Sequence, residues 1–269
     1  VPVMAMHRLP TKESGGRAYL HQGAIAVGID IATGITTRAY WHSKYIRYKP
    51  GTKRKLNGIK IPNWKSILEI AVKCHVAIGL GYLGVDIVLH PEKGPMVLEV
   101  NYQPGLQIQL ANRAGLKKRL ERVEGLDVID AEHGVRIAGA LFSGPFSRRV
   151  KPDQEGDKTV NVFEKIKVRS NTGKKVLVEA KLDTGAWRTS IDKKFAQELG
   201  LLEGKNVLWA RIFRSALGIQ RRSVIKLTFW LKGTKVTTTA SVADRKHLRK
   251  IIVIGRRDLK GFLVNPEQK

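Results

Sequence analysis

The sequence contains little cysteine, few acidic residues for its number of basic residues, and no long apolar run. Its only cysteine, Cys74, excludes an intrachain disulfide and indicates a reducing compartment. No stretch approaches the ~20 apolar residues that span a bilayer, and the first residues lack the features of a signal peptide. We therefore expect a cytoplasmic protein that makes no membrane contact.

Acidic residues are scarce: 49 Lys and Arg stand against 23 Asp and Glu, for a formal net charge of +26. Such a charge attracts polyanions, whether nucleic acid, anionic lipid or acidic peptide. The basic residues stand mostly in separated pairs, which is more typical of a solvated basic surface than of a patch that reads nucleic-acid sequence. Nucleic acid is therefore a partner that the charge allows but the pattern does not favour.

The chain length, 269 residues with 42% hydrophobic content, is sufficient for two ordinary domains. Residues 143–158 combine Pro, Gly and charged residues, a composition typical of a linker. We predict a front domain of residues 1–142, a linker at 143–158 and a back domain of residues 159–269.

The front domain shows helical and strand patterns together. Apolar residues recur at helical spacing from Trp64 to Ile78, with Asn63 as the expected N-cap and Gly79 as the stop. Two apolar strands are predicted at 83–89 and 96–101, and a basic loop at 45–60. The expected fold class is α+β, an antiparallel sheet with helices.

Three oxygen-bearing side chains lie on the two predicted strands. Asp86 stands on the first, while Glu99 and Asn101 are two residues apart on the second and so share one face. If the strands pair antiparallel, Asp86 lies close to that face. Such a set of oxygen donors suits a hard cation such as Mg²⁺. The alternative interpretation is that these carboxylates face solvent and bind no metal, which is common for strand carboxylates.

The back domain is predicted to be almost entirely β. A hairpin strand ends at Asp183 and is followed by the small residues Thr184 and Gly185. An aspartic peptidase presents its catalytic carboxylate in this way, at a tight turn among small residues, although Asp and Gly also populate ordinary turns. Asp192 is expected to cap a short helix that ends at Gly200.

Residues 1 to about 125 resemble the C-terminal part of ATP-grasp ligases, most closely the RimK-type α-L-glutamate ligases. Three motifs carry the likeness in the expected order: Arg17-x-x-Leu20-His21-Gln22-Gly23, then Gly84-Val85-Asp86, then Leu98-Glu99-Val100-Asn101. The resemblance implies a carboxylate–amine ligase that uses ATP and Mg²⁺.

In this resemblance each predicted residue of the front domain has a role. Asp86, Glu99 and Asn101 hold the Mg²⁺ that bridges the ATP phosphates, and Arg17 and His21 serve substrate or phosphate binding. The N-terminal half of the ATP-grasp fold, with its adenine-binding strands, is expected to be missing from the sequence, and ligase activity depends on that half.

Residues 160 to about 267 resemble retropepsin-like aspartic peptidases, and within them the RimB-type family sometimes labelled ATP-dependent zinc proteases. The match rests on Asp183-Thr184-Gly185-Ala186 and on Val253-Ile254-Gly255, which a short helix from Arg256 should follow. The resemblance implies an all-β closed barrel with Asp183, Thr184 and Gly185 as catalytic residues.

The peptidase hypothesis requires a second copy of the chain. Aspartic peptidases use two carboxylates that share one proton, and the sequence offers a single such motif, so a homodimer is expected through this domain. The basic segment Arg211–Arg222 is the predicted flap and would favour an acidic peptide substrate. No His-Glu-x-x-His pair occurs, and His247 is the only histidine of this domain, so no zinc site is predicted. The alternative is a catalytically silent basic module that binds acidic peptide or RNA.

Overall fold

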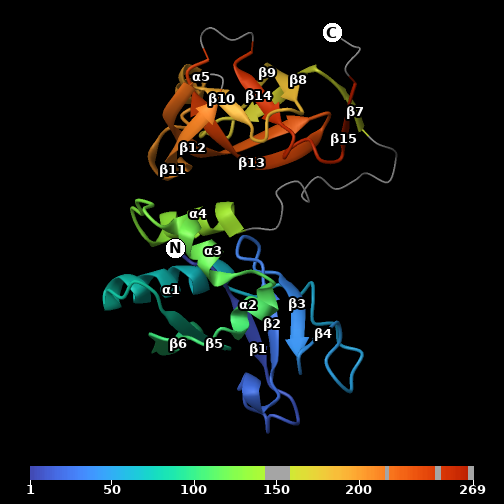
Figure 1. The fold of residues 1–269 in the computed structure, drawn as a ribbon, viewed down its shortest axis with the longest axis vertical. Coiled ribbons are helices and arrows are strands. Elements are labelled where there is room, and N and C mark those ends of the chain that lie inside the picture. Colours follow the sequence, from blue (N-terminus) through green and yellow to red (C-terminus); the bar gives the residue numbers. More distant parts are fainter. Residues whose placement is uncertain (143–157, 216–217, 246–249, 266–269) are drawn as a thin grey trace. The chain divides into compact units, whose positions relative to one another are not determined.

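A computed structural model describes residues 1–142, 158–215, 218–245 and 250–265 (Figure 1). The chain divides into two compact units, Val1–Ser143 and Gly144–Lys269. No helix among the described residues is long and apolar enough to cross a membrane.

The first unit is α+β. Its strands form a four-stranded antiparallel sheet in the order β1-β2-β3-β4 and a separate antiparallel pair, β5-β6. The elements are β1 (Met6–Leu9), η1 (Leu20–Gln22), β2 (Ile25–Ile29), β3 (Thr36–Trp41), β4 (Lys44–Ile46), α1 (Trp64–Ile78), β5 (Gly84–His90), β6 (Gly94–Asn101), α2 (Gln107–Asn112), α3 (Leu116–Val123) and α4 (Ala131–Phe142).

Helix α1 has the boundaries that the sequence predicts. It buries Trp64, Leu68 and Val72, which recur at four-residue spacing on one face. The Trp64 indole donates a hydrogen bond to the Ile31 carbonyl at 2.8 Å. Asn63 is the N-cap residue, as predicted, although its side chain makes no capping hydrogen bond.

The predicted basic loop at 45–60 is instead partly paired. Strand β4 continues the main sheet, and Tyr48 and Lys55 form a further antiparallel bridge. Helix α4 was not predicted from the sequence; it buries Ile137, Ala138, Leu141 and Phe142. The apolar neighbours of Cys74 in the sequence predict a buried thiol, but the residue is only half-buried.

The second unit is almost entirely β. Its described elements are β7 (Lys158–Asn161), β8 (Phe163–Arg169), β9 (Lys175–Asp183), β10 (Ser190–Asp192), α5 (Lys193–Glu198), η3 (Gly204–Asn206), β11 (Val207–Ser215), β12 (Gly218–Leu231), β13 (Thr234–Ala243), β14 (Ile252–Gly255) and β15 (Phe262–Asn265).

Seven of these strands form one mixed sheet in the order β11-β12-β13-β10-β14-β9-β8. Strand β8, the last strand in this order, also pairs antiparallel with β12, the second strand in it. Strands β15 and β7 form a separate parallel pair. The closed barrel itself stays a prediction.

One cluster of 20 buried apolar residues fills the second unit, including Phe229, Leu227 and Ile252. Strand β8 shows the alternation that places every second residue in this core. The Asp192 side chain caps α5 by accepting a hydrogen bond from the Phe195 amide at 3.1 Å, as predicted.

Two local predictions in the second unit are wrong. The sequence of residues 159–168 predicts one strand, but the structure divides this segment between β7 and β8. The short helix expected from Arg256 is a turn, in which the Asp258 amide donates to the Gly255 carbonyl at 2.9 Å. The carboxylate of Asp258 in this turn is fully buried.

Candidate functional site

Asp183 is the last residue of β9, an interior strand of the mixed sheet. Strand β9 pairs with β14 in parallel, and Gly255 is the partner of Asp183 in that register. The Asp183 Oδ1 atom accepts hydrogen bonds from the amides of Gly185 at 3.0 Å and Ala186 at 3.1 Å. The carboxylate is therefore held by the backbone of its own loop.

The tip of this loop is open to solvent. Thr184 and Gly185 are exposed, and the Asp183 side chain keeps 32% of its area exposed. Lys181, two residues earlier on the strand, places its Nζ 3.5 Å from Asp183 Oδ2. The structure thus brings the three predicted catalytic residues together, in one chain, as an accessible carboxylate beside two small residues.

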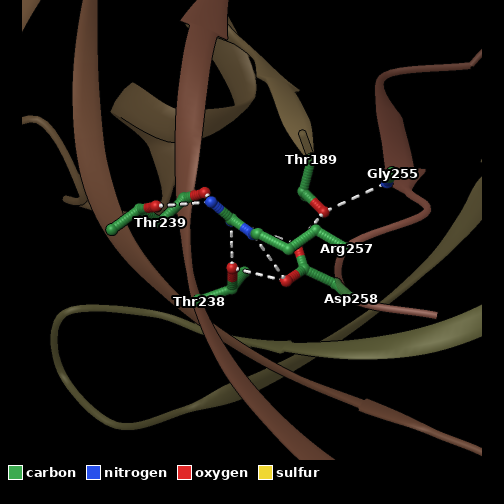
Figure 2. A network of polar contacts seen from close by, with 6 residues as sticks. All are labelled: Thr189, Thr238, Thr239, Gly255, Arg257 and Asp258. Atoms are coloured by element: carbon green, nitrogen blue, oxygen red, sulfur yellow. Dashed lines mark hydrogen bonds and ion pairs between the residues drawn. The ribbon is translucent and has the colours of Figure 1, made fainter. Parts of the chain in front are cut away.

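Behind this loop lies a buried polar network centred on Asp258 (Figure 2). The Asp258 carboxylate is fully buried and accepts hydrogen bonds from the hydroxyls of Thr189 at 2.6 Å and Thr238 at 2.8 Å. The Arg257 Nε also lies 3.2 Å from it. The Thr189 hydroxyl in turn accepts the Gly255 amide at 3.2 Å. The network ties the start of β10, strand β13 and the turn after β14 to one another.

Backbone contacts fix the chain between Asp183 and β10. The Arg256 amide donates to the Ala186 carbonyl at 2.8 Å, and the Arg257 amide donates to the Trp187 carbonyl at 3.3 Å. A side chain on Gly255 would lie 2.5 to 2.7 Å from backbone atoms of Arg188, so only glycine permits this approach. The turn at 255–258 is therefore what positions the candidate catalytic loop.

Positive charge gathers around Asp183. Arg245 donates through its Nη1 to the Ser190 hydroxyl at 2.9 Å and through its Nε to the Lys250 carbonyl at 3.1 Å. Burial and the neighbouring Arg222 charge lower the pKa of Arg245, while Asp192 and Asp183 raise it. Arg245 thus lies within electrostatic range of both Arg222 and Asp183.

The predicted flap is the long β11–β12 hairpin. Its register pairs Arg211 with Arg222 and Arg214 with Ile219. Ile212 and Ile219 are 70% and 69% exposed, whereas Arg222 is only 8% exposed. Arg222 donates to the Gln220 side chain at 3.0 Å. The hairpin thus exposes apolar side chains and buries one cation beneath them.

In the first unit the predicted metal ligands are neighbours. Asp86 and Glu99 are direct partners in the β5–β6 register, next to a bulge between Asp86 and Ile87. The Asn101 side-chain amide donates to Glu99 Oε1 at 3.2 Å. The sequence did not predict that Arg8, on β1, forms an ion pair with Asp86.

Arg17 and His21 lie elsewhere in the first unit. Both are exposed; Arg17 lies in the loop after β1, and His21 stacks on Tyr19 in η1 at 5.8 Å between ring centroids. No recorded hydrogen bond or ion pair in residues 1–142 joins either of them to Asp86, Glu99 or Asn101. The structure therefore brings three of the five predicted residues together.

The described residues contain no group of three or more His, Cys, Asp or Glu side chains placed to hold a metal ion. The set at β5–β6 comprises two carboxylates and one carboxamide. These are hard oxygen donors, which is the chemistry that Mg²⁺ takes when water completes its coordination. His247, considered for zinc, lies outside the described residues.

Sequence reasoning missed Arg8, Arg245 and Asp258. Asp258 stands three residues after the Val253-Ile254-Gly255 motif, but no local pattern distinguishes a buried Asp from a surface Asp. Arg8 contacts Asp86 across 78 residues of sequence, so spacing alone carries no signal of the pair.

Comparison with known proteins gives one family match. Residues 1–125 match the sequence model of the family described as sugar-transfer associated ATP-grasp. A search of curated proteins gave no match. The first part of the chain is thus similar to an ATP-grasp region, and the RimK-type assignment goes beyond this match.

Several solved structures are also similar to the chain. A protein of unknown function from Legionella pneumophila is 16% identical, covering 42% of this chain and 97% of that one at a TM-score of 0.28. A retropepsin-like aspartic protease from Rickettsia conorii is 21% identical, covering 38% and 80% at 0.29. A retroviral protease-like domain from Leishmania major is 19% identical, covering 37% and 72% at 0.25. None of these likenesses by itself establishes an activity.

Proposed function

We propose that the second unit is one half of an aspartic peptidase site, completed by Asp183 of a second copy of the chain. The observation that carries the proposal is the exposed Asp183-Thr184-Gly185 loop. Its carboxylate is held by two backbone amides, and its far side is fixed by the Gly255–Asp258 turn. A plain hairpin turn requires neither a buried carboxylate behind it nor a glycine pressed against its backbone.

The requirement for two copies follows from the chemistry. Peptide hydrolysis of this kind needs one carboxylate as base for the attacking water and one protonated carboxyl as acid for the leaving nitrogen. Two carboxyl groups placed side by side share a single proton, because both cannot ionise at short distance. The pair titrates jointly, with apparent pKa values that belong to the dimer.

Acidic peptides are the substrate class that we propose. Arg245 lies within electrostatic range of both Asp183 and the buried Arg222. Two guanidinium groups near the scissile position would bind carboxylate side chains, bidentately where the geometry allows. The exposed Ile212 and Ile219 of the β11–β12 hairpin would cover the bound peptide backbone.

The substitution Asp183→Asn tests the peptidase. It keeps the shape of the side chain but removes its base function, so cleavage of a peptide carrying a run of glutamates should be abolished. Glu198→Gln is the matched control, because it makes the same chemical change at an exposed position on α5. If Asp183→Asn cleaves as fast as the parent, the proposal is wrong and the alternative remains, a silent basic module that binds acidic peptide or RNA.

For the first unit we propose a carboxylate–amine ligase function of RimK type, in the cytoplasm. Asp86, Glu99 and Asn101 would hold Mg²⁺, which supplies charge neutralisation at the ATP phosphates. Arg17 and His21 would bind the carboxylate substrate or a phosphate. The Arg8 side chain would orient Asp86 and limit the negative charge of the set.

ATP turnover that depends on Mg²⁺ tests this second proposal. Glu99→Ala should abolish such turnover, whereas Glu92→Ala, at an exposed turn between the same two strands, should leave it unchanged. Turnover that survives Glu99→Ala would contradict the assigned ligand set.

A further inference from the structure

Residues 31–68 of the first unit contain nine basic residues and no Asp or Glu. The nine are Arg38, Lys44, Arg47, Lys49, Lys53, Arg54, Lys55, Lys60 and Lys65. Six of them fall within residues 44–55, which we call the basic hairpin. A dispersed basic surface does not have this form, because no acidic residue interrupts it.

The basic hairpin has a defined backbone. Strand β4 pairs with β3, and Figure 1 shows it at the outer edge of the four-stranded sheet. Beyond β4 the Lys49 amide donates to the Arg54 carbonyl at 2.9 Å, and the Leu56 amide donates to the Arg47 carbonyl at 3.0 Å. Leu56 anchors the returning strand, since it is 2% exposed within a core cluster. The backbone that carries the cations is therefore held by β4 and by the bridge between Tyr48 and Lys55.

The charges of the hairpin face solvent. Lys44, Arg47, Lys53, Arg54 and Lys55 are exposed, and Lys49 is half-buried. Among the described residues no ion pair is recorded for any of the six. The carboxylate at the base of the hairpin, Glu13, is bound by His42 at 2.8 Å. Six cations on one hairpin create a strongly positive local potential, which an anionic ligand with several charges would neutralise.

Two tyrosines lie among these charges. Tyr45 is 48% exposed; its hydroxyl donates to the Leu110 carbonyl at 3.0 Å, and the Arg113 guanidinium lies over its ring at 5.4 Å. Tyr48 is also 48% exposed, sits between Arg47 and Lys49, and is the cross-strand partner of Lys55. An exposed ring flanked by cations is the arrangement with which proteins stack a base while binding its phosphates.

We propose that the basic hairpin binds single-stranded nucleic acid, with phosphates on its Lys and Arg side chains and a base stacked on Tyr48. An acidic peptide would use the cations but leave the ring without a partner. An anionic lipid surface favours apolar side chains beside the cations, and the exposed aromatic residues of the hairpin are tyrosines.

Binding of the full chain to a fluorescein-labelled single-stranded RNA, measured by anisotropy over a range of salt, tests the charges. Lys53→Gln with Lys55→Gln should weaken binding at low salt by roughly tenfold or more and reduce the slope of log K against log salt by about 1.4, or about 0.7 per lost contact. The control, Lys117→Gln with Lys118→Gln on α3, removes the same charge from exposed positions and should change affinity far less.

The aromatic contact has its own test. Tyr48→Ala should weaken binding by roughly tenfold at fixed salt, and Tyr48→Phe should restore most of it because the ring is kept. Tyr102→Ala, at a residue that is 69% exposed elsewhere in the unit, is the control and should have no effect.

Three outcomes would overturn the proposal. Equal losses from the two lysine pairs would mean attraction to net charge alone. An unchanged affinity in Tyr48→Ala would exclude stacking. Tighter binding to phosphatidylserine vesicles or to poly-glutamate than to RNA would assign the hairpin to a different partner. None of these measurements involves Asp183, so the failure of this proposal would not bear on the peptidase proposal.

Discussion

Asp86 of the first unit and Asp183 of the second unit both stand on strands, but the surroundings of the two strands differ. Strand β5 belongs to a two-stranded sheet whose apolar residues are largely exposed, Leu98 at 67% and Val97 at 41%. Strand β9 lies between β8 and β14 in a seven-stranded sheet over a core of 20 buried residues.

The comparison shows how much of each site is fixed before a ligand binds. Two-stranded sheets have little stability of their own, and β5–β6 depends on its packing against α1. The loop of Asp183 is fixed by a buried network and by backbone hydrogen bonds. We therefore expect a preorganised site in the second unit and a more adaptable one in the first.

Replacing Asp by Ala at one position of each unit should give the largest difference in stability loss. Asp258→Ala removes the acceptor of two buried threonine hydroxyls and the carboxylate beside the Arg257 guanidinium, so it should destabilise the second unit by about 3–5 kcal/mol. Asp86→Ala breaks a pair with Arg8 that is 30% and 25% exposed, and should cost about 1 kcal/mol or less.

Hydrogen exchange followed peptide by peptide would measure both substitutions, because it assigns the loss of protection to one unit. Equal losses of protection in the two variants would mean that the Asp258 network does not stabilise its unit more than an ordinary half-exposed ion pair.

A smaller contrast is expected at two glycines near Asp183. Gly255→Ala forces a new methyl against the Arg188 backbone and should cost about 1–3 kcal/mol, together with loss of peptide cleavage. At Gly185 the nearest atom to a new methyl is Asp183 Oδ1 at 3.2 Å, so Gly185→Ala should cost less in stability. Urea unfolding and cleavage rates of the two variants would reveal whether the turn at 255–258 positions the loop.

The smallest effect concerns pH. Burial lowers the pKa of His7 below its ordinary 6.5. As pH falls, the His7 imidazole is therefore protonated in the unfolded chain at a higher pH than in the folded chain. The first unit should therefore lose stability below about pH 6.5, by about 1 kcal/mol per unit of pKa shift, and His7→Gln should remove this dependence.

Asp192 of the second unit also loses its stabilising contribution as pH falls, but at a lower pH than His7. Burial acts to raise its pKa, but hydrogen bonds from the amides of Arg245, Phe195, Lys194 and Lys193 lower it below 3.8. The ionised Asp192 carboxylate therefore stabilises the second unit above pH 3.8, and this contribution is lost as pH falls through the lowered pKa. Urea unfolding at pH 7, 5 and 3, followed by the amide NMR signals of each unit, should show the first unit weakening at pH 5 and the contribution of Asp192 lost only below pH 4.

The sequence predicted features that depend on nearby residues. The periodicity of α1, the Asp192 cap of α5, the β5–β6 pair and the strand that ends at Asp183 are all local patterns, and the structure confirms each of them. The Asp86–Glu99 pairing follows from strand register alone, so it could be anticipated.

The features that the sequence did not predict depend on distant partners. Arg8 reaches Asp86 across 78 residues, and Thr189 reaches Asp258 across 69. The family resemblance implied a short helix after Gly255, but the amides of Arg256 and Arg257 donate to the carbonyls of Ala186 and Trp187 instead. Long-range hydrogen bonds of this kind override local preference, and no pattern in the segment itself reveals them.

The central claim, that a peptidase site is assembled from Asp183 of two chains, is tested most directly by mixing. Parent chain and Asp183→Asn chain are combined in equal amounts, allowed to exchange, and assayed for cleavage of a glutamate-tagged peptide. If one Asp183 from each copy is needed, random pairing leaves about one quarter of the dimers active, and the parent chains lose about half of their activity. Activity that stays proportional to the amount of parent chain would contradict the claim, because each chain would then act alone.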